Sequence, residues 1–302
     1  MKKPDDCGLT PHQLKTIRIH ADRLLRAAGA HGCFPTPVDE LIEAAKISVE
    51  QEVSLDGSFL RRMYHRVSDP IKHAVEKVFG LFDSQDRTIY LDHSVHPSKK
   101  TFLKLHETAH GYIPYQQKTF ALIEESNATL DPDVRDEFDR EANVFASEVL
   151  FQLDRFTKAA ADCEFGIATP VDLSKRFGAS CYAAIRRYVT THHRACAVLV
   201  LNKPAYEVGN GWTTTLRRAF QSADFTTQFG EATWPDAYGP EDVLTSVIAT
   251  YQGFASPHVV LLRDLNNDTR RCVIESFNSS YQVFVFLYPE TELRRASIKV
   301  TV

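Results

Sequence analysis

The sequence predicts an α+β protein that is divided into more than one domain. Three observations lead to this prediction. The chain has 302 residues, which is more than one hydrophobic core usually organises. Apolar residues recur mainly at helical spacing before His193, whereas strand-like apolar runs follow Cys196. A content of 43% hydrophobic and 25% charged residues is typical of a folded protein rather than a disordered one.

Charge and cysteine content exclude several classes of protein. A formal net charge of −4 gives no attraction of the whole molecule to nucleic acid or to anionic membranes. The longest apolar run, Ala195–Leu201, is too short to span a bilayer, and the N-terminal residues form no apolar leader. Six scattered cysteines without a CxxC pair indicate reduced thiols. We therefore expect a soluble, cytoplasmic protein with no membrane partner.

The first predicted elements are two helices and a strand. Thr10-Pro11, with a glutamine three residues after the threonine, is a typical helix start. Apolar residues at helical spacing extend this helix to Gly29, where it should stop. Thr36-Pro37 begins a second helix. The next segment, Ile47–Val53, is rich in β-branched residues and is a candidate strand.

A hairpin and a helix are predicted next. Val75–Phe82 and Thr88–Leu91 flank a polar turn, which indicates two antiparallel strands. Pro97 then begins a helix that carries the segment LKLHETAHGYI, Leu103–Ile113. Its two histidines share one helical stripe with apolar residues of the core type, so we expect the imidazoles to point inward.

The remaining elements follow in the same way. The run FDREANVFASEVL, Phe138–Leu150, has helical periodicity, and its small alanines allow another helix to approach closely. Two helices, Thr169–Phe177 and Ser180–Tyr188, form a helix-turn-helix pattern. Strand-like runs follow a domain boundary near His193, with one helical stretch at Asp242–Tyr251.

The HETAH segment has the spacing of a zinc site. His106 and His110 are neighbours on one helix face, where two imidazoles can occupy two corners of a zinc tetrahedron. Glu107 lies beside them, where a carboxylate can take a proton from water and pass it to a leaving amine. Histidines can also be ordinary packing residues, but a pair at this spacing with the intervening glutamate favours metal binding.

A third protein ligand must come from elsewhere, because Gln116 occupies the place where metzincins carry another histidine. The DREAN segment offers two acids. Asp139 shares a stripe with small residues that can approach the HETAH helix, so we prefer it. Glu141 lies on another face and is the alternative.

Other polar and aromatic groups have two interpretations each. Four basic residues of the helix-turn-helix pattern can contact phosphates, although protein docking is favoured over DNA binding: Lys175, Arg176, Arg186 and Arg187. Tyr112 and Tyr115 can stabilise an oxyanion, although packing is favoured. The pair His192-His193 can bind a metal, although a surface role is favoured because adjacent side chains point apart. The C-terminal aromatics can enclose a small regulatory ligand or form core: Trp212, Trp234, Tyr238 and Tyr251.

HETAH followed by DREANVFASEVLF resembles the ImmA/IrrE family of metallopeptidases. The resemblance covers about Ala21 to Val189, and the remaining C-terminal part is more weakly similar to a GAF-like sensory domain. It implies three domains: a zincin-like metallopeptidase domain at 1–160, a short helix-turn-helix domain at 161–193 and a GAF-like α/β domain at 194–302.

The resemblance also implies an activity. The protein would be a zinc metalloendopeptidase of the HExxH type, with catalytic Glu107 and with Zn²⁺ on His106, His110 and Asp139. Its partner would be a helix-turn-helix repressor, cleaved in a stress or mobile-element response. Family members usually have glutamate where this chain has Asp139, which is one methylene shorter. Asp139 can therefore bind zinc only if the helices lie closer or the metal shifts; otherwise Glu141 would substitute or the affinity for zinc would fall. The alternative is a non-catalytic DNA- or protein-binding regulator whose metal is structural or absent.

Overall fold

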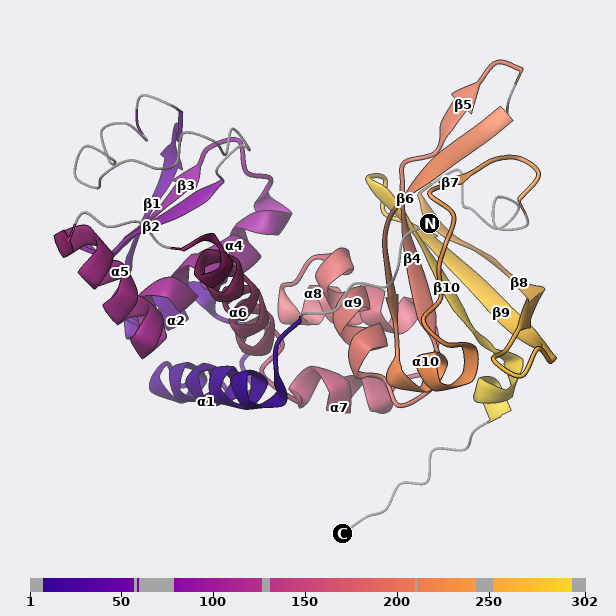
Figure 1. Ribbon diagram of the computed structural model, residues 1–302, viewed down its shortest axis with the longest axis horizontal. Helices are drawn as coiled ribbons and strands as arrows, with labels where there is room; N and C mark the ends of the chain where they lie inside the picture. The colour runs from indigo at the N-terminus through magenta and orange to yellow at the C-terminus, as the bar shows by residue number, and fades with distance from the viewer. Residues whose placement is uncertain are drawn as a thin grey trace, which may run out of the picture. The chain divides into compact units, whose positions relative to one another are not determined.

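The computed structural model describes residues 8–56, 59, 79–126, 131–209, 211–242 and 252–294. These residues form two compact units (Figure 1). The N-terminal unit comprises Cys7–Phe156 and Lys175–Ser180, and the C-terminal unit comprises Thr157–Ser174 and Cys181–Val302. Helices and sheets occur together, which confirms the α+β class. The division into three domains at 1–160, 161–193 and 194–302 stays a prediction.

Helices form most of the N-terminal unit. They are α1 (Pro11–Ala27), α2 (Val38–Ala44), α4 (Pro97–Tyr112), α5 (Pro114–Ser126) and α6 (Pro132–Leu150). The start of α1 is as predicted, because the Thr10 hydroxyl accepts from the Gln13 amide and the Gln13 side chain accepts from the Thr10 amide. α2 also begins directly after Thr36-Pro37, as predicted, although no side chain caps its first turn. Thr36 donates its hydroxyl to the Leu150 carbonyl at 2.8 Å, and Pro37 is the N-cap residue.

A small sheet completes the N-terminal unit. Its strands are β1 (Ser48–Val53), β2 (Gly80–Asp83) and β3 (Thr88–Asp92), in the order β1-β3-β2. β3 is parallel to β1 and antiparallel to β2. The predicted hairpin is therefore present as β2 and β3, although residues 75–78 of its first predicted strand lie outside the described residues. In this order β3 is the central strand, so among the described strands β2 lies at one edge of the sheet and β1 at the other.

Small side chains join α4 to α6. Ala109 of α4 and Ala142 and Ala146 of α6 are fully buried, which lets the two backbones approach closely. α6 begins at Pro132, six residues before the predicted segment, because Asp131 caps it by accepting from the Asp133 amide at 2.9 Å. The acids of the DREAN segment therefore lie on the middle turns of a long helix, beside α4.

Three short helices follow α6: α7 (Arg155–Ala161), α8 (Ala168–Phe177) and α9 (Cys181–Thr191). The two predicted helices of the helix-turn-helix pattern are present as α8 and α9. Within the C-terminal unit, the carboxylate of Glu275 accepts from the Ile167 amide at 2.8 Å, immediately before α8 begins.

A seven-stranded sheet dominates the C-terminal unit (Figure 1). Its strands are β4 (Ala197–Asn202), β5 (Ala205–Glu207), β6 (Gly211–Gln221), β7 (Ala237–Tyr238), β8 (Gly253–Arg263), β9 (Thr269–Asn278) and β10 (Gln282–Pro289). The order is β5-β6-β4-β10-β9-β8, and β7 pairs with β6. Two short helices, α10 (Ala223–Phe229) and η3 (Glu290–Arg294), accompany it.

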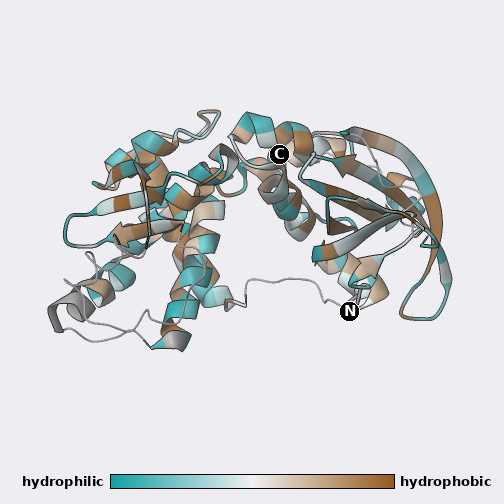
Figure 2. Cartoon of the chain, turned by 90° about the horizontal axis from the view of Figure 1, so that it is seen from above, coloured by the Kyte–Doolittle hydropathy of each residue, from teal (hydrophilic) through white to brown (hydrophobic). Residues whose placement is uncertain are grey.

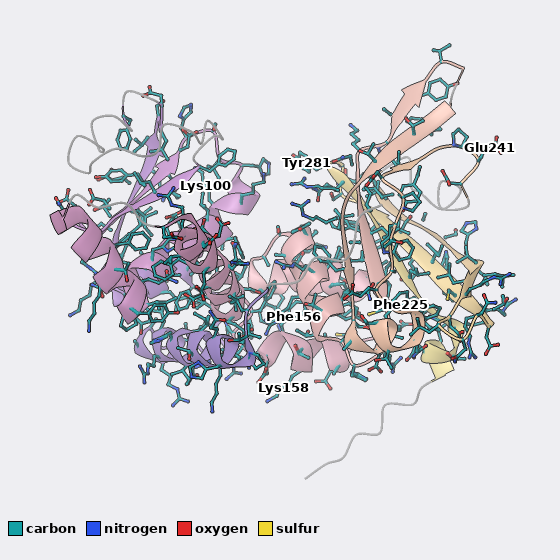
Figure 3. The ribbon with its side chains drawn as sticks, in the orientation of Figure 1. Lys100, Phe156, Lys158, Phe225, Glu241 and Tyr281 are labelled. Atoms are coloured by element: carbon teal, nitrogen blue, oxygen red, sulfur yellow. The ribbon has the colours of Figure 1, made fainter. Side chains whose placement is uncertain are left out.

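Both faces of this sheet are covered at β4 and β10. On one face, Leu199 and Val285 belong to a core that includes Phe225 of α10, which is labelled in Figure 3. On the other face, Tyr188 of α9 packs against Phe286 with ring centroids 6.0 Å apart. Because both faces are buried, these strands are continuous apolar runs, whereas other elements interleave polar and apolar residues (Figure 2).

Four predicted strands are confirmed as β4, β8, β9 and β10. The short strands β5 and β7, the long strand β6 and the helix α10 were not predicted. The helical stretch expected at Asp242–Tyr251 lies outside the described residues beyond Asp242. No described helix has both the length and the apolar character of a membrane span. The described cysteines are free thiols: Cys33, Cys163, Cys181, Cys196 and Cys272.

Candidate metal centre

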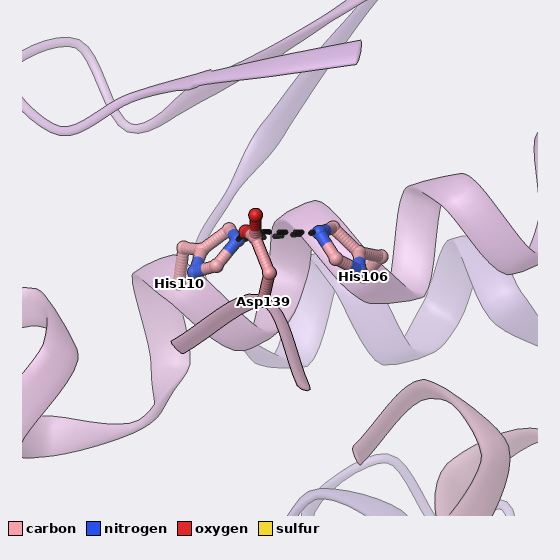
Figure 4. Close-up of side chains that lie close together, drawn as sticks. All are labelled: His106, His110 and Asp139. Carbon is pink, nitrogen blue, oxygen red and sulfur yellow. Dashed lines mark hydrogen bonds and ion pairs between the residues drawn. The ribbon is translucent and has the colours of Figure 1, made fainter. Parts of the chain in front are cut away.

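Two helices bring three metal-ligating side chains together (Figure 4). His106 and His110 lie one turn apart on α4, and their Nε2 atoms are 3.3 Å from each other. Asp139 of α6 faces both rings, with its Oδ1 atom 3.8 Å from the Nε2 of His106 and 3.7 Å from that of His110. It is the one such group of three found among the described residues.

The triangle of these three atoms fits zinc. Ligands about 2.1 Å from a tetrahedral ion lie roughly 3.4 Å from one another, close to the three separations observed here. The Asp139 side chain is 52% exposed, whereas those of His106 and His110 are 16% and 9% exposed. These three atoms would form one face of a zinc tetrahedron, and the exposure of Asp139 would leave room for a fourth ligand, as a catalytic zinc requires.

The other ring nitrogen of each histidine has its own partner. The Nδ1 atom of His106 lies 3.1 Å from Oδ1 of Asn143, one turn after Asp139 on α6. The Nδ1 atom of His110 lies 2.8 Å from Oε1 of Gln116. Both partners are hydrogen-bond acceptors, so they favour a proton on Nδ1 and a lone pair on Nε2.

Glu141 does not join the triangle. Its carboxylate accepts from the Gln116 side-chain amide at 2.7 Å and from the hydroxyl of Tyr115. Burial raises the pKa of Glu141, and these two hydrogen bonds oppose the rise. Sequence reasoning left Asp139 and Glu141 as alternatives, and the structure brings only Asp139 to the imidazoles.

Glu107 lies between α4 and the edge strand β2. It is 8% exposed, and its carboxylate accepts from the backbone amide of Phe82. A methyl group at Gly80 would lie 3.0 Å from its Oε1 atom. Burial raises the pKa of Glu107 to about 8, and the charge of Asp139 acts in the same direction. A carboxyl with a pKa near neutral can both accept and return a proton.

Both imidazoles are poised as neutral ligands. Burial lowers the pKa of His110 to about 3, and the neighbouring His106 acts in the same direction. Burial also lowers the pKa of His106, against the charge of Asp139. Partial burial raises the pKa of Asp139, against the charge of His106. Neutral imidazole is the form that binds a metal, so the site needs no histidine deprotonation near pH 7.

Tyr112 and Tyr115, which lie near the site, each pack against a phenylalanine of α6. Tyr112 packs against Phe145 with centroids 6.0 Å apart. Tyr115 packs against Phe138 at 6.1 Å and donates its hydroxyl to Glu141. Sequence reasoning missed Asn143 as a partner of His106 and did not assign Gln116 to His110. The one available signal was that Gln116 stands where metzincins place a third histidine.

Other predicted groups have contacts of their own. Arg176 stacks on Phe34 at 4.6 Å, and Arg186 stacks on Phe220 at 5.3 Å. Arg187 is 8% exposed. The surface prediction holds only in part for His192, which is partly exposed and packs against Phe165 and Tyr188 with ring centroids 4.8 Å apart in each pair. His193 is exposed.

The C-terminal aromatics do not form one group. Tyr238 is buried in the sheet core, and Trp234 packs against that core. Trp212 is 44% exposed and lies 5.4 Å from the ring of Tyr206. Tyr251 lies outside the described residues.

One comparison with known proteins, that with family models, agrees with the sequence resemblance. Residues 70–188 match the family model of the IrrE N-terminal-like domain, a peptidase family. No curated protein matches the chain. One similar solved structure is a Mycobacterium tuberculosis transcriptional regulator, with 14% sequence identity, coverage of 95% of this chain and 92% of that chain, and a TM-score of 0.48.

The matched segment carries both the HETAH helix and the DREAN helix, so the three candidate ligands lie within the part of the chain that is similar to this peptidase family. The resemblance to the ImmA/IrrE family is confirmed over residues 70–188.

Proposed function

We propose that the N-terminal unit is a zinc-dependent endopeptidase of the HExxH type. The observation that carries the proposal is the triangle of His106, His110 and Asp139, whose edges of 3.3, 3.7 and 3.8 Å fit one face of a zinc tetrahedron. These three residues would hold the ion. When bound, zinc would polarise the scissile carbonyl and make water a competent nucleophile near neutral pH.

Glu107 moves the proton in this mechanism. It takes a proton from water as the water oxygen attacks the carbonyl carbon, and it gives that proton to the amide nitrogen as the carbon–nitrogen bond breaks. Its position supports this role, because the carboxylate follows His106 directly and is held by the Phe82 amide beside the triangle.

The edge of β2 in the small sheet is an argument for a peptide substrate. The Phe79 carbonyl accepts from the Asp92 amide, so in this register Leu81 points its backbone groups towards β3. Gly80 and Phe82 therefore point theirs away from β3, on the side where Phe82 reaches Glu107. An extended peptide that added to this edge would lie along α4, past Glu107.

The proposed substrate is a helix-turn-helix transcriptional repressor, whose cleavage would relieve repression in a stress or mobile-element response. Support for this partner is the family resemblance, which the match over residues 70–188 strengthens. The free thiols of the described cysteines suit a reducing cytoplasm, where such a repressor would be met.

The test is co-expression with the repressors encoded beside the protein, read as discrete fragments. The parent should cleave one of them at a defined bond. Glu107→Gln should retain zinc and lose cleavage, because it removes the proton acceptor and no ligand. His110→Ala should lose both zinc and cleavage. Parental cleavage by Glu107→Gln would disprove the catalytic assignment.

The alternative function is a DNA- or protein-binding regulator without catalysis. Its DNA-binding form needs the basic residues of α8 and α9, but Arg176 and Arg186 stack on aromatic rings and Arg187 is buried. Metal analysis and a salt-dependent DNA titration distinguish the two functions. Tight, sequence-selective DNA binding by a metal-free chain would favour the alternative.

A further inference from the structure

A chain of hydrogen bonds runs from the metal centre into the protein. His110 contacts Gln116 at 2.8 Å, Gln116 contacts Glu141 at 2.7 Å, and Tyr115 donates its hydroxyl to Glu141. Gln116 is fully buried, and Glu141 is 4% exposed. The chain joins three helices, because His110 lies on α4, Tyr115 and Gln116 on α5 and Glu141 on α6.

The contacts fix which way the Gln116 amide points. Its nitrogen faces two acceptors, the Glu141 carboxylate at 2.7 Å and the Phe138 carbonyl at 3.5 Å. An oxygen in that position would face two other oxygens. The amide oxygen must therefore face Nδ1 of His110, and it can only accept.

The orientation of Gln116 in turn fixes the tautomer of His110. Nδ1 must carry the proton that it donates to Gln116, which leaves the lone pair on Nε2. That Nε2 atom is the one that lies 3.3 Å from Nε2 of His106 and 3.7 Å from Oδ1 of Asp139. The ring is thus held with its free lone pair towards the metal centre.

The charge of Glu141 needs a counterpart. Among the described residues, its carboxylate has two hydrogen-bond donors and no lysine or arginine partner. Glu148, a buried glutamate two turns further along α6, is instead paired with Arg18 at 2.8 Å. A buried carboxylate without a cation is costly unless positive charge lies close by. A zinc ion held by His110 would supply positive charge at the other end of this hydrogen-bond chain.

We infer that Glu141 and Gln116 are positioning residues that orient His110 and strengthen its binding of zinc, a role that rests on the proposed function. Glu141, the alternative ligand in the sequence analysis, then acts through Gln116 rather than on the metal. Loss of such an outer partner typically lowers metal affinity by about 10–100-fold.

The experiment is zinc affinity measured by competition with a chromophoric chelator. Glu141→Gln should lower the affinity of the otherwise intact chain by about 10–100-fold. Glu148→Gln is the matched control, because it makes the same change at a buried glutamate of the same helix. That control should bind zinc like the parent.

A rescue separates positioning from general stability. Gln116→Glu combined with Glu141→Gln exchanges the two groups, so that a carboxylate accepts directly from His110 and an amide donates to that carboxylate. The exchanged pair should recover most of the affinity that Glu141→Gln loses. Parental affinity in Glu141→Gln, or an exchanged pair as weak as that single variant, would overturn the inference.

The outcomes also separate this inference from the proposed function. If the parent binds zinc, His110→Ala does not, and Glu141→Gln binds like the parent, then the hydrogen-bond chain has no positioning role and the metal site stands. If the parent itself binds no zinc, the proposed function and the inference both fail.

Discussion

Asp139 is one methylene shorter than the glutamate usual in the resembling family, and the structure shows how it reaches the imidazoles. Its carboxylate lies within 3.8 Å of both Nε2 atoms, and the small residues Ala142 and Ala146, which follow it on the same stripe of α6, are fully buried. Aspartate, although shorter than glutamate, can therefore reach both histidines when α6 packs closely against α4. The half-exposed side chain would also leave room for a fourth ligand.

Asp139→Asn tests the third ligand. The change keeps the shape of the side chain and removes its charge, so zinc affinity should fall by more than the roughly 10–100-fold expected for an outer partner. Equilibrium competition against a chelator measures this. Asp133→Asn, in the exposed first turn of the same helix, should bind like the parent. Unchanged affinity in Asp139→Asn would show that another acid completes the site.

At the scale of single residues, the three candidate ligands could be predicted from the sequence, but the hydrogen-bond partners of the two imidazole rings could not. His106 and His110 follow from a spacing that the helix itself imposes, and Asp139 follows from a stripe of small residues on another helix. Gln116 and Asn143 touch the rings across helix–helix contacts. No fixed sequence spacing links residues of different helices, so these pairings appear only once the helices are packed.

At the scale of elements, the close approach of α4 to the small sheet depends on one glycine. A methyl group at Gly111 would lie 2.4 Å from Cζ of Phe82 and 2.9 Å from Cδ1 of Ile47. Arg87, next to β3, strengthens the same junction by donating to the Gly111 carbonyl at 3.2 Å and to the Ala45 carbonyl at 2.9 Å. These contacts therefore hold the C-terminal end of α4 against the small sheet, next to the place where Glu107 contacts β2.

Gly111→Ala should destabilise this junction. Because the added methyl overlaps the Phe82 ring, we expect the free energy of unfolding to fall by about 1–3 kcal/mol. Urea unfolding followed by far-ultraviolet circular dichroism measures the loss. Phe82→Leu in the same chain shortens the opposing side chain and should recover part of it. A Gly111→Ala chain as stable as the parent would show that the gap accommodates the methyl.

Element prediction worked where one periodicity dominates. α1, α9 and β4 were predicted because their caps or apolar repeats are strong local signals. β6 was missed because buried and exposed positions alternate along it around Thr213–Thr215, which gives no apolar run. α6 was predicted too short because its cap, Asp131, lies in a polar stretch far from the apolar repeat.

At the scale of the whole molecule, the chain forms two compact units with different chemistry. The candidate metal centre lies entirely in the N-terminal unit, whereas both tryptophans, Trp212 and Trp234, lie in the C-terminal unit. The contact pattern groups most of α8 and all of α9 with the C-terminal sheet. The sequence shows that the spacing of apolar residues changes from helical to strand-like near His193, but it does not show which sheet the preceding helices cover.

The C-terminal unit should lose stability in mild acid through His192. Its Nδ1 atom accepts from the Arg194 amide at 3.0 Å, so a proton there would face a donor. Burial lowers the pKa of His192 to about 3, with the charges of His193 and Arg194 acting in the same direction. The unfolded chain therefore binds more protons, and this stabilisation is complete above about pH 6.5 and is lost as pH falls towards 3.

His192→Asn provides the comparison, because its side-chain oxygen can still accept from the Arg194 amide while the titrating ring is gone. Between pH 7.5 and 5, the urea midpoint reported by tryptophan fluorescence should fall less in this variant than in the parent. The two tryptophans confine the readout to the C-terminal unit. An equal fall in both chains would assign the acid sensitivity to other groups.

The uneven exposure of the three candidate ligands has a consequence for how the ion would come and go. The imidazoles are mostly covered, whereas the carboxylate of Asp139 is half open to solvent. A metal ion would therefore enter and leave the site on the side of Asp139, without separation of the packed helices α4 and α6. Loading of the proposed site would then depend on the concentration of free ion around the folded chain.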